Sequence, residues 1–274
     1  MNDLYTLYTR SFPQYPASRE KFAGITDGAV LFTRTVGQTP AGFALVRENS
    51  ISLLCVDEAY RHRGIGSSLL AEAEKHIAET GAETILLGRG NGYILQGVPE
   101  EHPEAVSFFQ KRGYIADWSS VNMMLDLRTY HAQDHPIPPC PADVIFRPAQ
   151  QEDTDALLRA VLAVNEKWVW YFEHNSDPVL VAEQNSEIIG FEMLCTKDIY
   201  FSFHGETIGS IGCVGVIKSA RCQGIGLRMV QEGLLALKKQ GCTRMELLYT
   251  YKADWYGKLG FAVMHTQWMG KKTI

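Results

Sequence analysis

The sequence of 274 residues has no apolar run approaching the roughly 18 residues that a membrane-spanning helix needs. It also lacks a basic excess, because 26 Lys and Arg stand against 31 Asp and Glu, which gives a net charge of −5. We therefore expect no membrane partner and no nucleic-acid partner. The segment from Met1 to Tyr5 lacks the basic start and apolar core of a signal peptide, which favours a cytoplasmic protein.

Cysteine patterns that hold small folds together are also missing. The six cysteines include no C-x-x-C pair, and several lie in apolar runs, where a reduced thiol acts as a small hydrophobic side chain. We expect no disulfides in this context. His131, His135 and Cys140 lie close together, but their segment is rich in proline and has no fourth ligand nearby. The segment therefore predicts a linker and no metal site.

What the sequence does contain is one six-residue pattern written twice. It is Arg-His-Arg-Gly-Ile-Gly at 61–66 and Arg-Cys-Gln-Gly-Ile-Gly at 221–226, each between a short apolar run and an amphipathic segment. This order is typical of a strand, a tight glycine turn and a helix whose free N–H groups converge on an anion. Each copy therefore predicts a phosphate-binding loop.

The repeat extends well beyond the motif. An offset of 160 positions aligns the preceding strand, the apolar stripe of the helix and the glycine after it without a gap: Ile51 with Ile211, Val56 with Val216, Ile65 with Ile225, Leu69 with Met229, Leu70 with Val230, Ile77 with Leu237, and Gly81 with Gly241. Any helix packed on a sheet has such a stripe, but the shared register of all these features indicates a duplicated domain.

The predicted elements interleave helices with strands, which indicates a mixed α/β fold. In the first half we expect helices at 4–12, 18–25, 66–79 and 103–111, and strands at 30–35, 42–47, 52–56, 84–87 and 121–127. In the second half we expect helices at 154–165, after the second loop and at 253–258, and strands at 179–182, 187–196, 209–216, 245–248 and 262–268. We predict domains at 1–130 and 144–274, joined by a proline-rich linker at 131–143 that can be neither helix nor central strand.

The two copies of the motif do not match either of two common nucleotide-binding loops. The dinucleotide fingerprint requires a third glycine where the two copies have Leu69 and Met229, and the Walker A loop requires a Gly-Lys pair that both copies lack. A simple tight turn is the alternative for either copy taken alone.

The pattern R-x-x-G-x-G between an apolar strand and a helix resembles the acyl-CoA loop of the GNAT superfamily of N-acetyltransferases. A second family signature, an aromatic residue followed by Lys and a Gly-aromatic pair, appears as Phe109 to Tyr114 and as Tyr256 to Phe261. The resemblance covers nearly the whole chain as two tandem units. It implies that each unit has a mixed, mostly antiparallel central sheet flanked by helices.

The resemblance also implies acetyl-CoA as co-substrate. The loop amides would bind the pyrophosphate, the two arginines would add charge, and the strand before each loop would pair with the pantetheine arm. Glycines at 209, 212 and 215 on the second of these strands predict a bulge or a close approach of the ligand, with relief of helix–strand packing as the alternative. The cofactor-binding residues are then Leu54, Val56, Arg61, Arg63, Gly64, Ile65 and Gly66 in the first half, and Val214, Val216, Arg221, Gln223, Gly224, Ile225 and Gly226 in the second.

The two halves differ where chemistry would occur. In the family, a Tyr in the short late helix commonly gives a proton to the departing thiolate; the second half has Tyr256 there, whereas the first has Phe109. A phenyl ring cannot donate a proton, so the difference favours catalysis in the C-terminal half and a degenerate N-terminal half. Glu192 is the candidate general base, because it alternates with apolar neighbours and could face the cleft. A solvated strand carboxylate is the alternative.

Arg61 and Gly113 are 52 positions apart, but Arg221 and Gly260 only 39. The extra residues of the first half lie within 88–102, where they could shape a pocket, close over the cofactor or bridge the domains.

The expected function is acetyl transfer from acetyl-CoA to the primary amine of a small molecule, by direct attack in a ternary complex. The alternatives are acetylation of a protein N-terminus or lysine, and a CoA-binding sensor or scaffold without catalysis. The sequence predicts no oligomeric state.

Overall fold

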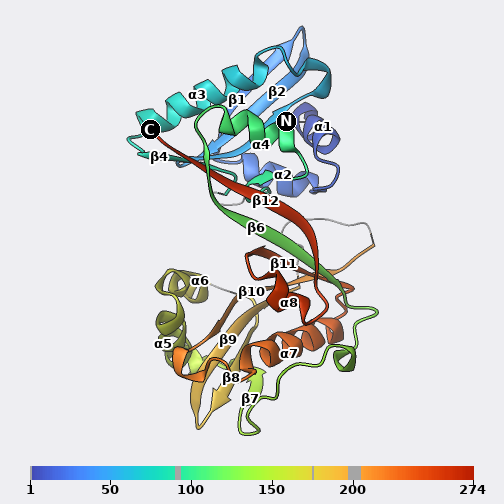
Figure 1. The fold of residues 1–274 in the computed structure, drawn as a ribbon, viewed down its shortest axis with the longest axis vertical. Helices are drawn as coiled ribbons and strands as arrows, with labels where there is room; N and C mark the ends of the chain where they lie inside the picture. The colour runs from blue at the N-terminus through green and yellow to red at the C-terminus, as the bar shows by residue number, and fades with distance from the viewer. Residues whose placement is uncertain (1, 90–93, 175, 197–204) are drawn as a thin grey trace. The chain divides into compact units, whose positions relative to one another are not determined.

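The structure is a computed structural model that describes residues 2–89, 94–174, 176–196 and 205–274 (Figure 1). Its contacts divide the chain into two units. Of the described residues, the first unit comprises 2–89, 94–121 and 265–274, and the second comprises 122–174, 176–196 and 205–264. No helix in these ranges is long and apolar enough to cross a membrane.

The first unit packs helices on both faces of a sheet. A Cβ at Gly42 would lie 3.1 Å from Ile65 and 3.2 Å from Leu69 of the helix after the first glycine loop. The next residue, Phe43, points to the other face, where its ring meets Phe22 at 6.2 Å. The elements are α1 (Asn2–Ser11), α2 (Arg19–Thr26), β1 (Val30–Val36), β2 (Thr39–Arg47), β3 (Ser50–Val56), α3 (Ile65–Glu79), β4 (Thr84–Leu87), β5 (Val98–Pro99), α4 (Pro103–Gln110) and the start of β6 (Ile115–Asp126).

The strands of this unit diverge beside the first glycine loop. β1, β2 and β3 are antiparallel neighbours. β3 and β4 are parallel but pair only at Ser50 with Leu86 and Ile51 with Leu87. β3 then runs on to Val56, whereas β4 ends at Leu87, so the two strands separate toward the loop.

The last strand of the first unit comes from the far end of the sequence. β12 (Ala262–Thr273) is antiparallel to β4, with Lys271 opposite Leu86 and Thr273 opposite Thr84, and it also pairs with β5. Figure 1 shows β12 in red beside β4. Trp268 on this strand is buried in the first unit's core with Ile77 and other apolar side chains. Residues 265–274 are therefore an integral part of the N-terminal unit.

The second unit repeats the plan. β7 to β10 are antiparallel neighbours, and β10 and β11 are parallel over only three pairs, the last of them Ser210 with Glu246. The predicted bulge is confirmed, because the β9–β10 register shifts between Gly212 and Gly215. The elements are the end of β6, β7 (Ile145–Pro148), α5 (Thr154–Val164), α6 (Val169–Glu173), β8 (Val179–Gln184), β9 (Glu187–Cys195), β10 (Ile208–Val216), α7 (Ile225–Lys239), β11 (Arg244–Thr250), α8 (Ala253–Gly257) and the start of β12.

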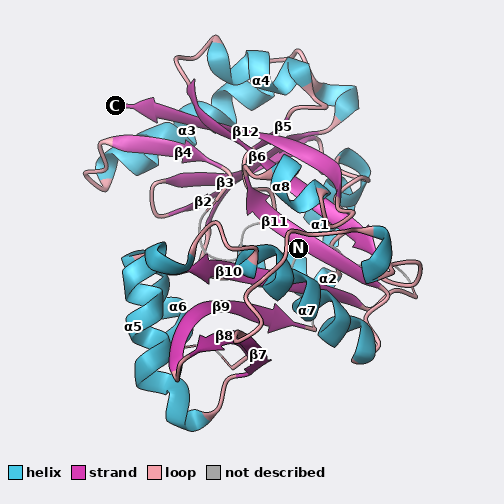
Figure 2. Ribbon diagram, turned by 60° about the horizontal axis from the view of Figure 1, so that its bottom comes forward, coloured by secondary structure: helices cyan, strands magenta, loops and turns pink. Residues whose placement is uncertain are grey.

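Helices α5 and α7 cover opposite faces of this sheet (Figure 2). Phe191 of β9 packs with Leu157 and Val161 of α5. Glu192, the next residue, points the other way, against Gly233 of α7. Both faces of β9 are thus buried, which decides the surroundings of Glu192.

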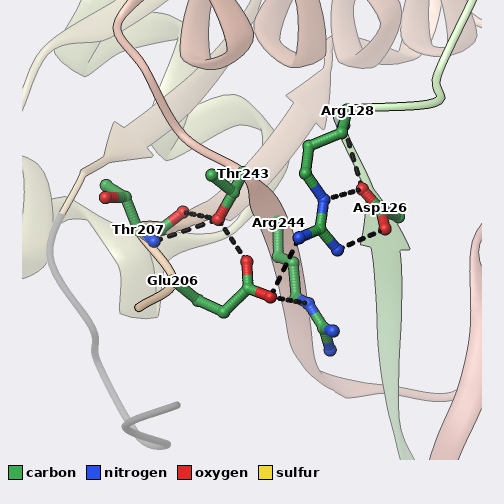
Figure 3. A network of polar contacts seen from close by, with 6 residues as sticks. All are labelled: Asp126, Arg128, Glu206, Thr207, Thr243 and Arg244. Carbon is green, nitrogen blue, oxygen red and sulfur yellow. Dashed lines mark hydrogen bonds and ion pairs between the residues drawn. The ribbon is translucent and has the colours of Figure 1, made fainter. Parts of the chain in front are cut away.

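A polar network holds the end of β6 in the second unit (Figure 3). Arg128 binds Asp126 at 2.6 Å and Glu206 at 3.2 Å, and Glu206 also accepts a bond from Thr243 at 2.5 Å. Arg128 lowers the pKa of Asp126 to about 2. Leu127 N–H, just past β6, donates to the Thr243 carbonyl at 2.9 Å. These contacts attach residues 126–128, at the end of β6, to the start of β11.

The units therefore interleave in sequence, whereas the predicted domains at 1–130 and 144–274 are contiguous. The mixed, mostly antiparallel sheets flanked by helices are as predicted. The predicted helices and strands are present, and the two strands that run longest beyond prediction are β6 and β12, which begin in one unit and end in the other.

Candidate functional site

Both glycine loops have the backbone that their sequence predicts. Gly64 caps α3 with φ of 80°, and Gly224 caps α7 with φ of 76°. Two positions earlier, His62 and Cys222 also have positive φ, of 60° and 63°. Left-handed residues just before a helix are typical of turns whose N–H groups face one concave site and bind anions. Each loop thus has the geometry of a phosphate cradle.

The two motif arginines tie each loop to its strand. Arg61 Nε donates to the Val56 carbonyl at 3.2 Å, and Arg221 Nε donates to the Val216 carbonyl at 2.9 Å. Both side chains are exposed. The first role of these arginines is therefore to fix the loop, while they also bring positive charge to it.

A cavity of about 710 Å³ lies on the first loop. Of the predicted residues, Leu54, Val56, Arg61, Gly64 and Gly66 line it. The side chains of the other two point elsewhere: Arg63 lies over the Tyr60 ring at 5.4 Å, and Ile65 packs against Gly42. Backbone N–H groups can still serve the cradle at both positions.

The additional segment of the first half lines the same cavity. Its described residues in the lining are Gly88, Leu95, Gly97, Val98, Pro99 and His102, and residues 90–93 lie outside the described ranges. The described part of this segment therefore shapes a pocket, which is one of the three roles considered for it.

A neighbouring segment lies against Gly224 of the second loop, whereas nothing lies against Gly64 of the first. We call residues 135–141 the proline strap. A Cβ at Gly224 would lie 2.6 Å from the Pro139 carbonyl oxygen and 2.8 Å from that of Pro138, whereas at Gly64 nothing lies within 4 Å. The strap's carbonyl oxygens, the negative ends of peptide dipoles, therefore lie at the loop that was predicted to receive an anion.

Neighbouring contacts hold the strap in place. A Cβ at Gly260 would lie 2.5 Å from the His135 ring, which stacks on Tyr130 at 5.4 Å. Lys238 of α7 donates to the Tyr130 carbonyl at 2.8 Å. The segment expected to be a linker is thus packed against the start of α7 and against Gly260, which follows α8.

The same domain is recognised in both halves of the chain by comparison with known proteins. A family model described as an acetyltransferase (GNAT) domain matches residues 27–116 and again residues 175–263. The chain belongs to the GNAT acetyltransferase family. No curated protein sequence matches it significantly.

Solved structures share the GNAT fold across almost the full chain. A glucosamine N-acetyltransferase region of a fungal multi-domain GH3 beta-N-acetylglucosaminidase aligns with a TM-score of 0.83 at 21% identity, covering 98% of this chain but only 36% of the fungal one. A GCN5-related N-acetyltransferase from Sphaerobacter thermophilus aligns with a TM-score of 0.78 at 19% identity, covering 99% and 91%. A tandem GNAT protein from the clavulanic acid biosynthesis pathway has a TM-score of 0.72 at 13% identity, covering 99% and 94%.

The second GNAT unit brings its two predicted catalytic residues close enough to interact. Tyr256 on α8 is buried, and burial together with the charge of Glu192 raises the pKa of its phenol. In the first unit the corresponding ring is Phe109, which packs on its neighbour Phe108 at 5.1 Å, much as Tyr256 packs on Trp255 at 4.7 Å. Tyr256 and Phe109 thus pack in a similar way on the preceding aromatic residue, and they differ in the phenol hydroxyl.

Glu192 is fully buried, so the alternative of a solvated strand carboxylate is wrong. Burial, with Glu232 nearby, raises the pKa of its carboxyl well above the usual range. Neither carboxyl oxygen has a hydrogen-bond partner within the described part of the chain. Glu192 is buried, although it occupies the polar face of β9 in the sequence pattern, because α7 covers that face of the strand.

The remaining predicted residues of the second GNAT unit are split between the loop surface and the core. Val214 lies in the β10 bulge and Gln223 is exposed on the loop. Ile225 is buried, and a Cβ at Gly226 would lie 3.3 Å from Trp255. The side chain of Ile225 is thus part of the core, while its N–H belongs to the cradle.

Arg112 is a cavity residue that the sequence analysis missed. It donates to Ser67 Oγ at 2.7 Å and lies over the Phe108 ring at 3.7 Å, beside Gly66. The equivalent position in the second signature is Leu259, which is buried. Aligning the two signatures residue by residue would have found it, because only the first GNAT unit has a cation there.

Proposed function

We propose that this GNAT protein is an acetyl-CoA-dependent N-acetyltransferase that acetylates the primary amine of a small molecule, and that it binds its acyl donor in the first unit. The observation that carries the proposal is the cavity of about 710 Å³ on the open loop at Gly64.

The residues around this cavity suit coenzyme A at both ends. Arg61, His62, Lys111 and Arg112 line the end at the loop, where the anionic pyrophosphate would meet the N-terminus of α3. β3 from Ser52 to Val56 lines the length of the cavity after β4 has diverged. Its backbone groups there are available to pair with the amides of the pantetheine arm.

The chain's own contribution to the transfer is to position the reactants and exclude water. The thioester is already activated toward amines, so holding the amine nitrogen against its carbonyl carbon supplies much of the rate. The apolar wall of Leu53, Leu87 and Leu95 lowers the dielectric around the reacting atoms.

Catalysis in the second unit by Tyr256 and Glu192 stays a prediction. Their proximity and the raised pKa of the Tyr256 phenol favour it, because a protonated phenol can donate to sulfur. The proline strap on Gly224 weighs against binding of an anion there.

Matched variants at the two loops test which unit binds the donor. Gly66→Asp and Gly226→Asp each place a carboxylate at the second residue of a helix, where it favours the helix but repels a bound pyrophosphate. We expect Gly66→Asp to abolish high-affinity binding of coenzyme A by calorimetry and thiol release from acetyl-CoA, and Gly226→Asp to leave both intact. The reverse pattern would place the reaction in the second unit, and no effect of either variant would refute the proposal.

The acceptor is tested with a panel of amines that includes amino sugars, because the fungal structural relative is described as a glucosamine N-acetyltransferase region. Peptides with a free N-terminus or an internal lysine represent the protein-acetylating alternative. Binding of coenzyme A without thiol release for any amine would favour a sensor or scaffold.

A further inference from the structure

A short turn of residues 95–97 lies at the point where β3 and β4 of the first unit separate. The last pair of the two strands is Ile51 with Leu87. The next residue, Gly88, still donates its N–H to the Ile51 carbonyl at 2.9 Å. A Cβ at Gly88 would lie 2.5 Å from the backbone nitrogen of Gly97. The turn therefore rests directly on the residue at which the two strands part.

The turn is fixed on both sides by backbone contacts. Arg89, the residue after Gly88, donates its N–H to the Leu95 carbonyl at 3.2 Å. A Cβ at Gly97 would lie 2.6 Å from the Trp268 carbonyl oxygen of β12, and Val98 pairs with Trp268 in the sheet. The turn thus lies between the end of β4 and β12, and it cannot withdraw unless one of these strands moves.

Leu95 is the residue that gives this turn an apolar surface in the cavity. Leu95 and Gly97 both line the cavity, whereas Gln96 between them does not. Because Gly97 has no side chain, the side chain that the turn contributes to the cavity lining belongs to Leu95. Leu53 and Leu87 line the cavity as well, so the surroundings of Leu95 suit an apolar group of a ligand.

β3 connects the phosphate cradle to this turn over a length that matches the pantetheine arm. The loop follows Val56, and β3 leaves β4 at Ser52, four residues earlier and about 13 Å away. About twelve backbone bonds join the first oxygen of the arm to its sulfur, as many as in about four extended residues. An arm that starts at the cradle and pairs with this stretch brings its sulfur to Ser52. The acyl group then extends toward the turn.

We propose that Leu95 closes the end of the donor channel and limits the acyl group to about the size of acetyl, an inference that rests on the proposed function. Each further methylene would press on a side chain whose backbone is held between two strands. Such overpacking forces side chains out of their preferred rotamers. One methylene in an apolar pocket changes discrimination by about 10–200-fold. The first unit therefore selects a short-chain acyl-CoA as its donor.

Calorimetry without an amine tests this role with three ligands, coenzyme A, acetyl-CoA and butyryl-CoA. We expect wild type to bind butyryl-CoA at least about tenfold more weakly than acetyl-CoA. Leu95→Ala should bring the two Kd values within about threefold of each other by strengthening butyryl-CoA binding. The Kd for coenzyme A should not change, because the free thiol does not reach the wall.

Two more variants complete the test. Leu95→Val removes one methylene, so it should narrow the difference in part, and it serves if Leu95→Ala fails to fold. Ile94→Ala is the matched control, since Ile94 is the buried neighbour of Leu95 and does not line the cavity. This control should keep the difference seen in wild type.

Three results would overturn the inference. They are equal binding of butyryl-CoA and acetyl-CoA by wild type, an unchanged difference in the folded Leu95 variants, and the same change in Ile94→Ala as in Leu95→Ala. In each case, coenzyme A binding and thiol release that are lost in Gly66→Asp would leave the proposed function standing. No binding of coenzyme A by wild type, or its loss only in Gly226→Asp, would refute the proposed function and this inference with it.

Discussion

The contact between the proline strap and the second loop can be measured with one matched pair, Gly64→Ala and Gly224→Ala. Both glycines are left-handed, with φ of 80° and 76°, so either alanine should cost about 1–2 kcal/mol of backbone strain. At Gly64 the new methyl group meets nothing within 4 Å, so no further cost arises.

At Gly224 the methyl carbon would lie 2.6 Å from the Pro139 carbonyl oxygen. Ordinary contact begins near 3.5 Å, so the strap would have to withdraw by about 0.9 Å. Crowding of this kind adds about 1–3 kcal/mol. We therefore expect Gly224→Ala to lower the melting temperature by roughly 3–9 °C more than Gly64→Ala does.

Thermal unfolding by circular dichroism measures the difference, and limited proteolysis reports on the strap itself. Cleavage within residues 131–141 should be faster in Gly224→Ala than in wild type, and unchanged in Gly64→Ala. Equal losses of stability together with equal cleavage would refute the reasoning, because they would mean that the strap does not rest on the loop.

Three further predictions concern a buried carboxyl, a cation and the exchanged strand. The pKa of Glu192 is raised by burial, so the second unit is most stable below the ordinary carboxyl pKa and loses stability as pH rises through the raised one. Glu192→Gln removes this loss, and its gain in melting temperature over wild type should be larger at pH 8 than at pH 5; an equal gain at both would contradict the assignment. Arg112→Leu, which copies Leu259 of the second unit, should weaken coenzyme A binding about tenfold by calorimetry, and an unchanged Kd would remove Arg112 from the site. Fragment 1–130 lacks residues 265–274, so it should show no cooperative unfolding until a peptide of residues 262–274 is added, and a cooperative transition without the peptide would show that β12 is dispensable.

The local features of the fold could be predicted from the sequence because their causes are local. Gly64 and Gly224 mark turns that require positive φ, and the stripe from Ile65 to Ile77 marks the helix that follows. The glycines of β10 correctly predicted the bulge. The phosphate cradles follow from these same few residues.

The contacts between distant segments could not be predicted in this way. β6 and β12 are both recognisable as strands, but nothing in their patterns says which strand each one pairs with. The four prolines within residues 136–141 exclude regular structure and therefore predict a linker, yet they carry no sign of the loop on which the segment packs. Glu192 alternates with apolar residues as a solvated residue would, and it is buried because α7 covers a face that the strand pattern leaves undetermined. The proposed choice of donor-binding unit depends on these contacts, since the strap lies against Gly224 of one loop and nothing lies against Gly64 of the other.

The position of β12 in the sequence also sets the time at which the first unit can finish folding. Residue 265 follows residue 121 by 144 positions, and ribosomes add about 5–20 residues per second, so this unit waits about 7–30 s for its last strand. During that interval the edge of β4 has no partner on the side that β12 later takes. Unpaired edges recruit other chains, so the yield of native protein should depend on how fast the second half is synthesised and on chaperones that bind the nascent first half.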